Sequence, residues 1–268
     1  MSKGANSFTW TVGLGACSAS STVTVYNNSF VTNAGSDQSV CSTSATLGAV
    51  LNTGETGSWS LGSGFGVVST PSAANSAVTS LQLGKTTFQW TVSKNGCTAS
   101  SLVNVTNDSP SAAQVSSSIE VCSTSAQLSA TVPVVGVGGW STLSAATIQQ
   151  PAVANSSVRG LGQGSNIFTW TVKNNSCTLS SDLLVQNNSV VSDAGTMVSS
   201  CSNASGLNGT NPVQGLGSWS VLSGGATVAT PSSATSAVSG LSLGDNRFKW
   251  TVSLGSCSAS STTVIRDD

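Results

Sequence analysis

The sequence repeats itself at a constant step along its whole length. One tryptophan and one cysteine recur at this step in four copies, and a second cysteine and a second tryptophan recur in three copies at nearly the same step. These residues are Trp10, Trp90, Trp170, Trp250, Cys17, Cys97, Cys177 and Cys257, and then Cys41, Cys122, Cys201, Trp59, Trp140 and Trp219. A fixed period of about 80 residues is long enough for each copy to be a small domain, so it predicts a tandem array.

The register of the repeat sets the expected domain boundaries. Complete repeats are expected at residues 30–109, 110–189 and 190–268, and residues 1–29 match only the last third of a repeat. A partial domain cannot bury its own hydrophobic face, so we expect this sequence to be an excerpt of a longer array. The same expectation accounts for an N-terminus without the apolar segment of a signal peptide.

Each repeat carries strand and turn signals and no helical periodicity. Phe88, Trp90 and Val92 alternate with polar residues, which is the period of a half-buried strand. Asn95-Gly96 follows, and this dipeptide is a strong signal for a hairpin turn. Short strands between turn residues, about seven per repeat, predict an all-β fold of tandem Ig-like β-sandwiches, which we expect to be arranged as a rod.

The large aromatic residues are expected to form the core of each sandwich. Every complete repeat has an early tryptophan, similar to the buried tryptophan of Ig domains, and a later strand that carries a phenylalanine and a second tryptophan. The expected core residues are Trp10, Trp59, Phe88, Trp90, Trp140, Phe168, Trp170, Trp219, Phe248 and Trp250. Domains this small bury a limited share of their surface, so we expect them to need covalent support.

The seven cysteines occupy one early and one late position in the repeat. We expect pairing within each complete repeat, where every bridge closes a loop of about 56 residues and stabilises the fold by about 4 kcal/mol. The expected pairs are Cys41 with Cys97, Cys122 with Cys177, and Cys201 with Cys257. Cys17 is expected to be unpaired, because its partner would lie in the missing part of its repeat. Structural disulfides predict an extracellular protein.

Other cysteine chemistry fits the sequence less well. Zinc sites usually use cysteines two to four residues apart, often with histidine, and this chain has no such pair and no histidine. A reactive thiol needs a nearby base or cation, and neither recurs beside the cysteines.

Composition argues against catalysis and against several classes of partner. The absence of histidine removes Ser-His and Cys-His mechanisms, and none of the nine acidic residues occupies the same place in all three complete repeats. Asp37, Asp193 and Asp245 are isolated, unlike the acidic loops that bind calcium. We therefore predict that the chain is not an enzyme and has no cofactor and no metal. Only 6% of residues are charged and the net charge is −1, so we expect no nucleic acid as a partner. No apolar run approaches the roughly 18 residues needed to span a bilayer, so we expect no membrane insertion.

Three Asn-x-Ser sequons recur at the boundaries between repeats, at Asn27, Asn107 and Asn187. Sequons can mark glycosylation sites, but many arise by chance in a chain this rich in asparagine and serine. The simpler interpretation is that these asparagines form turns at the ends of the repeats.

The repeat resembles the PKD-like, Ig-like repeats of giant cell-surface proteins from Bacteroidota, such as the SprB-like gliding-motility adhesins. The resemblance covers the whole chain and is carried by Gly57-Ser58-Trp59-Ser60, Pro71 to Leu81, Phe88 to Val92 and Cys97, with their equivalents in the other repeats. It implies a secreted protein of the cell surface, exported by the type IX secretion system, that forms filaments for adhesion or gliding motility.

The favoured function is therefore a non-catalytic stalk or filament segment of a large bacterial surface adhesin. Its expected partners are the neighbouring repeats of the same long chain, with surface glycans or other cell-surface proteins left open. Three alternatives remain open at this point. They are a carbohydrate-binding β-sandwich array, a spacer attached to a secreted enzyme, and self-assembly in which a second chain completes residues 1–29.

Overall fold

The computed structural model describes residues 1–268, and all of its regular elements are β-strands. The chain divides into two compact units. The first contains residues 1–111 together with residues 173–178, and the second contains residues 112–172 and 179–268. The prediction of an all-β array of Ig-like sandwiches is confirmed by the sheets described below.

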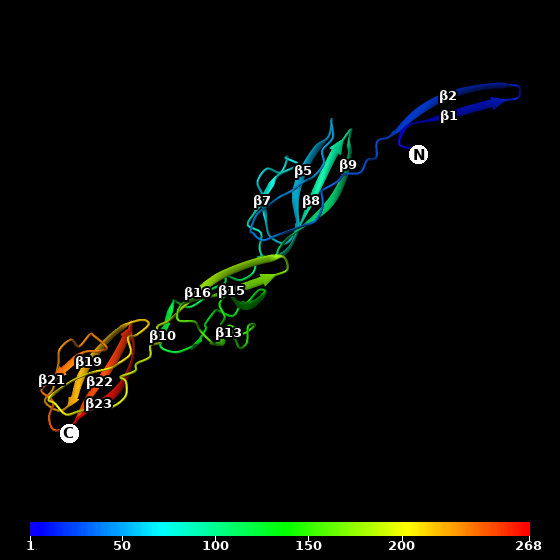
Figure 1. Cartoon of the computed structure of the whole chain (residues 1–268). Coiled ribbons are helices and arrows are strands. Elements are labelled where there is room, and N and C mark those ends of the chain that lie inside the picture. The colour runs from blue at the N-terminus through cyan, green and yellow to red at the C-terminus, as the bar shows by residue number, and fades with distance from the viewer. The chain divides into compact units, whose positions relative to one another are not determined.

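The first unit contains a separate hairpin and one β-sandwich (Figure 1). The hairpin consists of β1 (Gly4–Leu14) and β2 (Cys17–Asn27). The four-stranded sheet of the sandwich has the order β3 (Gln38–Val40), β9 (Cys97–Asn107), β8 (Gly84–Lys94), β5 (Thr56–Ser63). The three-stranded sheet has the order β4 (Ala45–Thr46), β7 (Ala77–Thr79), β6 (Val67–Val68).

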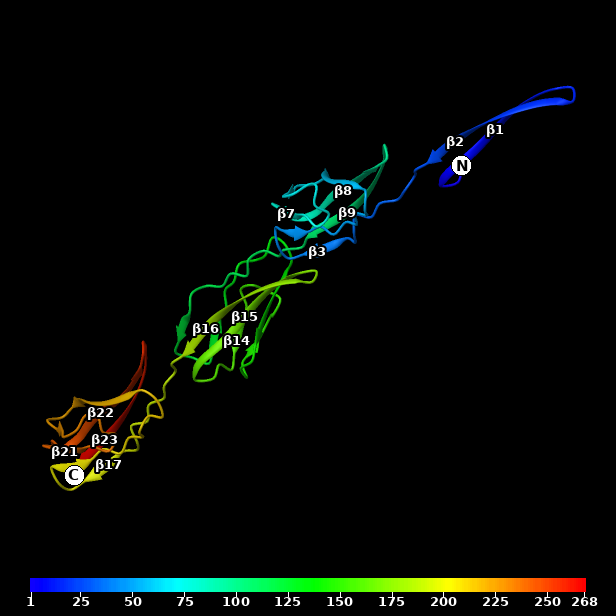
Figure 2. The same cartoon turned by 90° about the horizontal axis from the view of Figure 1, so that it is seen from above.

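The second unit contains two further sandwiches with the same strand order (Figure 2). One is built from β10 (Ile119–Val121), β16 (Cys177–Asn187), β15 (Gly164–Asn174) and β12 (Val137–Thr142), with β11 (Ser125–Gln127), β14 (Ser157–Arg159) and β13 (Thr147–Ile148). The other is built from β17 (Val198–Ser200), β23 (Cys257–Asp267), β22 (Gly244–Leu254) and β19 (Leu216–Ser223), with β18 (Ala204–Gly206), β21 (Ala237–Ser239) and β20 (Thr227–Val228). We call the three sandwiches the first, second and third repeat.

The core of each repeat lies between its two sheets and follows from the alternation in the sequence. In β8 the side chains of Phe88, Trp90 and Val92 are fully buried, and β15 and β22 bury their equivalents in the same way. The early tryptophan of the neighbouring strand packs on the late one, with ring centroids 4.9 Å apart for Trp59 and Trp90. Such tilted aromatic pairs add a favourable contribution beyond the burial of their area.

The recurrent segment that begins at Pro71 fixes the early tryptophan. The backbone N–H of Trp59 donates to the carbonyl of Pro71 at 2.8 Å, and its indole N–H donates to the carbonyl of Ala74 at 3.2 Å. The hydroxyl of Ser76 accepts from the backbone N–H of Thr70 at 2.9 Å. The same three contacts recur in the second and third repeats. The indole N–H of each early tryptophan is thereby satisfied by a backbone carbonyl, and the hydroxyl of the recurrent serine accepts a backbone N–H of the same segment.

The structure buries nine of the ten aromatic residues expected in the core, and Trp10 is the exception. The side chain of Trp10 is 73% exposed, because β1 and β2 form a two-stranded sheet with no second sheet packed over it. The expectation that Trp10 is a core residue is therefore wrong in this structure. Phe8 and Val12, on the same strand, are exposed for the same reason.

A glycine two residues before each early tryptophan makes room for the late one. A side chain on Gly57, Gly138 or Gly217 would overlap the indole ring of Trp90, Trp170 or Trp250. The indole is buried and cannot move aside without displacing the core. The glycine of the Gly-x-Trp-Ser motif is therefore a packing requirement, because a buried core tolerates extra atoms poorly.

We expect Gly138→Ala to lower the free energy of unfolding of the second repeat by about 1–3 kcal/mol, because its methyl group would overlap the ring of Trp170. Gly139→Ala is the matched control, since its Cβ would meet only the carbonyl oxygen of Pro151 at 3.9 Å. Urea unfolding of the oxidised full chain measures both. Equal midpoints for the two variants would contradict the packing role of Gly138.

Candidate functional site

The two cysteines of one repeat lie at opposite ends of its longest sheet. In the first repeat β3 runs parallel to β9 and pairs Val40 with Asn107, so Cys41 lies beside the last residues of β9. Cys97 is the first residue of β9, at the hairpin tip. The 11 residues of β9 span roughly 33 Å. A disulfide needs Cα atoms about 4.4–6.8 Å apart, so these two cysteines cannot pair.

The disulfides of the structure instead join successive repeats. Cys41 pairs with Cys177, with Cα atoms 5.4 Å apart, and Cys122 pairs with Cys257, with Cα atoms 5.3 Å apart. The predicted pairs Cys41–Cys97, Cys122–Cys177 and Cys201–Cys257 are therefore wrong in this structure. Cys97 and Cys201 are free, as is Cys17. The rule is that the early cysteine of one repeat binds the late cysteine of the next.

Polar contacts surround the bridge in the first unit, which includes the hairpin tip of residues 173–178. The side chain of Asn175 donates to Asp108 Oδ1 at 2.9 Å, and that of Asn174 donates to the Asp108 carbonyl at 3.1 Å. Ser39 donates its hydroxyl to Asp108 Oδ2 at 2.5 Å, and the backbone N–H of Asp108 donates to Val40. Asp108 thus forms hydrogen bonds both with its own repeat and with the hairpin tip of the next repeat.

Different polar residues surround the Cys122–Cys257 bridge, at the positions equivalent to those around the first bridge. Glu120 Oε1 accepts from the backbone N–H of Ser256 at 2.8 Å and from the Ser256 hydroxyl at 3.0 Å. Asn188, the equivalent of Asp108, also donates to Glu120. The hydrogen bond from Asn188, followed by those from Ser256, holds the pKa of Glu120 below its ordinary value of 4.5. Glu120 is therefore the acceptor that recognises the tip of the third repeat.

We call this arrangement the junction, defined by an early cysteine at a strand end, the polar residues beside it, and the hairpin tip that carries a late cysteine. The docked cysteines Cys177 and Cys257 are buried, with 1% and 2% exposure, whereas the late cysteine Cys17 is exposed. The junction thus buries the late cysteine of each bridge and adds hydrogen bonds to charged acceptors, which are stronger than neutral ones. It joins successive repeats by a disulfide and by hydrogen bonds.

The recurrent sequon asparagines shape the strand end that receives the tip. Asn107 Nδ2 donates to the carbonyl of Leu81 at 3.2 Å, and its Oδ1 accepts from the backbone N–H of Ser109 at 3.0 Å. Asn187 makes the equivalent bonds to Leu161 and Ser189. Both side chains are buried, and their amide nitrogens already have partners. In the folded chain these two residues serve as turn residues, as the simpler interpretation of the sequons expects.

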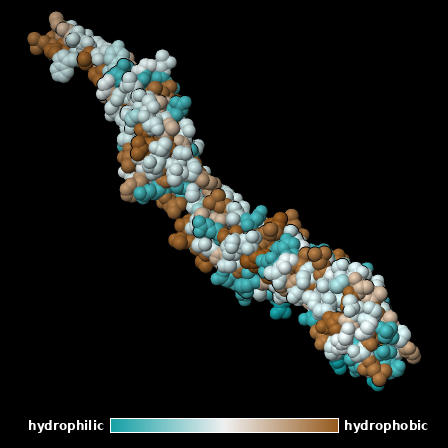
Figure 3. All heavy atoms as spheres, turned by 90° about the vertical axis from the view of Figure 1, so that its left-hand side faces the viewer, coloured by the Kyte–Doolittle hydropathy of each residue, from teal (hydrophilic) through white to brown (hydrophobic).

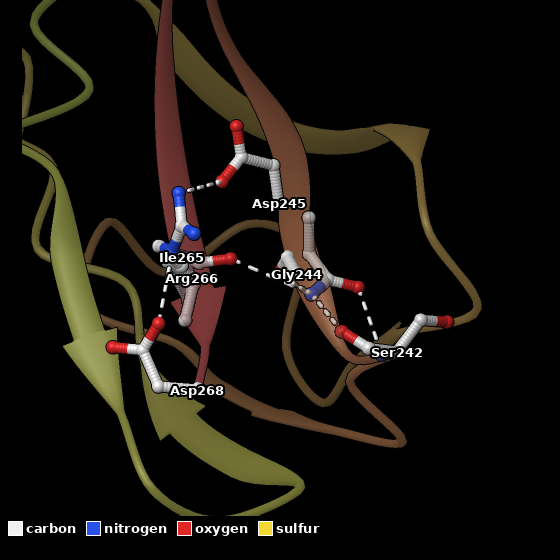
Figure 4. A network of polar contacts seen from close by, with 7 residues as sticks. Ser242, Gly244, Asp245, Ile265, Arg266 and Asp268 are labelled. Atoms are coloured by element: carbon white, nitrogen blue, oxygen red, sulfur yellow. Dashed lines mark hydrogen bonds and ion pairs between the residues drawn. The ribbon is translucent and has the colours of Figure 1, made fainter.

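The rest of the surface offers few groups for chemistry. Figure 3 shows a surface that is mostly of intermediate hydropathy, with small separate hydrophilic and hydrophobic areas. No cluster of three or more histidine, cysteine or acidic residues in residues 1–268 could hold a metal ion. The structure has no helix that could span a membrane. Arg266 forms the largest ion-pair network, with Asp245 at 3.6 Å and Asp268 at 2.9 Å (Figure 4).

Comparisons with known proteins show the fold. No protein-family model matches the chain, and no curated protein matches it. Among solved structures, the eight N-terminal Ig domains of Down Syndrome Cell Adhesion Molecule align with 98% of this chain and 40% of that chain, at 9% identity and a TM-score of 0.55. The titin I-band fragment I67–I69 aligns with 88% of this chain and 96% of that chain, at 13% identity and a TM-score of 0.44. The chain is similar to tandem arrays of Ig domains.

Sequence reasoning did not find the polar residues of the junction. Ser39 and Asp108 take part in one junction, and Glu120 and Asn188 take their places in the other. Because these residues change together from repeat to repeat, no constant motif marks them. The one usable signal was the position of every late cysteine directly after a hairpin turn, which places it at a tip.

We expect the contact between Glu120 and Ser256 to weaken in acid. The pKa of Glu120 is lowered in the folded chain, so its contribution is present above pH 4.5 and is lost as the pH falls through that lowered pKa. The protection factor of the Ser256 amide in hydrogen exchange should therefore fall in acid. Glu120→Gln should abolish this pH dependence, and Glu55→Gln, which changes a carboxylate of the first repeat, should preserve it. An unchanged pH dependence in Glu120→Gln would contradict the assignment.

Proposed function

We propose that this chain is a load-bearing, non-catalytic segment of an extracellular stalk or filament. The observation that carries the proposal is the pair of disulfides across successive junctions. Disulfides persist in oxidising compartments outside the cytosol, which supports an extracellular location. The repeats proposed as building blocks are residues 30–109, 110–189 and 190–268, with residues 1–29 as the end of a further repeat. The role of a stalk in a large bacterial surface adhesin, exported by the type IX system for adhesion or gliding, is supported by the sequence resemblance.

The disulfides change the path along which tension would run through the chain. The shortest covalent path from Cys41 to Cys257 crosses to Cys177, runs back to Cys122 and crosses again. At roughly 3.5 Å per extended residue, the segment between Cys122 and Cys177 spans roughly 190 Å. Without the bridges, the extended chain from Cys41 to Cys257 would span roughly 750 Å. The bridges therefore shorten the fully extended path between these residues by roughly 560 Å. A chain that must stay short under load benefits from such a restriction.

The two loops overlap, so each bridge supports the other. With the Cys41–Cys177 bridge removed, tension can still run along the chain from Cys41 to Cys122 and across to Cys257, a path of roughly 280 Å. With only the Cys122–Cys257 bridge removed, the path crosses to Cys177 and follows the chain, again over roughly 280 Å. Loss of one bridge therefore adds only roughly 90 Å to the path. This redundancy fits a stalk that must survive single breaks.

The three complete repeats give no specific support to the carbohydrate-binding alternative. Sugar binding by stacking needs exposed aromatic rings, and Phe65 is the one aromatic side chain exposed in residues 30–268. Phe8, Trp10 and Tyr26 are exposed on the hairpin of residues 4–27, which has no second sheet over it. The tryptophans of the three complete repeats are all core residues. We therefore propose neighbouring repeats as the partners of this segment.

Force spectroscopy tests this proposal in a background in which the three free cysteines are serine. We expect Cys41→Ser with Cys177→Ser to add roughly 90 Å to the fully extended length of the oxidised chain. Cys122→Ser with Cys257→Ser should add about as much, and all four substitutions together roughly 560 Å.

The gain in extended length expected from all four substitutions is much larger than the sum of the gains from the two double variants. This excess is the signature of overlapping loops. In this background the one bridge within a repeat that can still form is Cys122–Cys177, and each double variant removes it. Equal gains of roughly 190 Å in both double variants and in the fourfold variant would therefore contradict the load-bearing path. Reduction of the unsubstituted chain with dithiothreitol serves as the control for complete release.

A further inference from the structure

The two hairpin tips that dock in the junctions have the same kind of backbone turn. Each tip has a loop of two residues before its late cysteine, Asn175-Ser176 in the second repeat and Gly255-Ser256 in the third. The first loop residue has a positive φ in both, 51° at Asn175 and 58° at Gly255. Glycine and asparagine adopt this conformation more readily than other residues. Because the late cysteine follows the same turn on both tips, a preference of one strand end for one tip has to come from side chains.

The side chain of the first loop residue is used in one junction and excluded from the other. In the first unit, Asn175 donates its side-chain N–H to Asp108 Oδ1 at 2.9 Å. In the second unit, a Cβ atom on Gly255 would overlap Glu120 Oε1 and would lie 2.7 Å from Asn188 Nδ2. Cβ atoms essentially never approach other atoms within 3.0 Å. The first junction therefore gains a hydrogen bond from asparagine at this position, and the second has room only for glycine.

The strand ends differ in size in the opposite sense. Ser39 and Glu120 occupy equivalent positions, two residues before the early cysteine of their repeats. The short Ser39 donates its hydroxyl to Asp108 of its own repeat, whereas the longer Glu120 reaches the backbone N–H of Ser256 on the docked tip. A small residue on the strand end is thus combined with asparagine on the tip, and a large residue on the strand end is combined with glycine.

We propose that these two combinations determine which hairpin tip each strand end accepts, and therefore which cysteines pair. Ser39 and Asp108 select a tip with asparagine at the first loop position, and Glu120 and Asn188 select a tip with glycine there. Thiol chemistry alone does not make this choice, because four cysteines can pair in three ways. The proposal requires the junctions and does not depend on the load-bearing role.

The two mismatched combinations are disfavoured for different reasons. Asparagine in place of Gly255 would either displace Glu120 from the N–H of Ser256 or hold the tip away from the strand end. Glycine in place of Asn175 would remove a donor from Asp108, which is only 8% exposed, so water replaces the lost bond poorly. Overlap at one junction and a lost hydrogen bond at the other are both ways of building specificity against a wrong partner.

The redox equilibrium of each bridge measures this selection. The second junction is studied in a full-length chain that retains only Cys122 and Cys257, and the first in a chain that retains only Cys41 and Cys177, with serine at the other cysteine positions. Bridge formation oxidises two protein thiols and reduces one oxidised glutathione to two glutathione thiols. A tip that docks well raises the effective concentration of its thiol and so raises the equilibrium constant of this exchange. Mass spectrometry of alkylated samples gives the bridged fraction at each glutathione ratio.

At the second junction, we expect Gly255→Asn to lower the equilibrium constant about tenfold, because the added side chain overlaps Glu120. Glu120→Ser with Asn188→Asp should also lower it about tenfold, because the hydrogen bonds from Ser256 are lost. All three substitutions together recreate the combination of the first junction and should restore the constant to within about threefold of its original value. A triple variant that bridges no better than Gly255→Asn alone would overturn the proposal.

At the first junction, Asn175→Gly should lower the equilibrium constant about tenfold, because Asp108 loses a donor. Asn95→Gly is the matched control, since Asn95 has φ 49° in the hairpin turn before Cys97, which is free in the structure. It makes the same change in a tip that is not bridged and should leave the constant unchanged. Equal constants for the Asn175→Gly and Asn95→Gly chains would overturn the proposal.

Discussion

The parallel pairing of the first strand with the last strand decides where the cysteines of each repeat lie. Because β3 follows β9 in the same direction, the residue after β3 lies at the end of β9, and the cysteine that opens β9 lies at the opposite end of the sheet. β10 with β16 and β17 with β23 repeat this arrangement. Each repeat thus presents one thiol at each end and cannot join them. Only a neighbouring repeat can supply the partner.

This constraint explains why the interior of each repeat is stabilised by packing and hydrogen bonds, without a disulfide of its own. The core of every sandwich depends on a tryptophan pair, a glycine beneath the late indole, and a proline-containing segment that satisfies the early indole. None of these features involves charge, and the chain has few charged residues to use. Covalent support is added at the junctions, where charged or polar acceptors such as Asp108 and Glu120 also gather. Stability and connection are therefore provided by different parts of the repeat.

The sequence was sufficient to predict the fold because its period, its alternating strands and its turns all agree. The same alternation predicted the aromatic residues of the core. That prediction is wrong only for Trp10, whose strand has no opposing sheet. The cysteine pairing could not be read from spacing, because spacing counts residues along the chain and ignores which end of a strand they occupy. Parallel pairing of two strands far apart in sequence was the missing information. The polar residues of the junction vary between repeats and left no motif.

The central claim is that disulfides connect successive repeats, and peptide mapping of the oxidised full chain tests it most directly. Free thiols are alkylated first, and the chain is then digested without reduction and analysed by mass spectrometry. The structure predicts linked peptides for Cys41 with Cys177 and for Cys122 with Cys257, with alkylated Cys97 and Cys201. Linked peptides for Cys41 with Cys97, or for Cys201 with Cys257, would contradict the account.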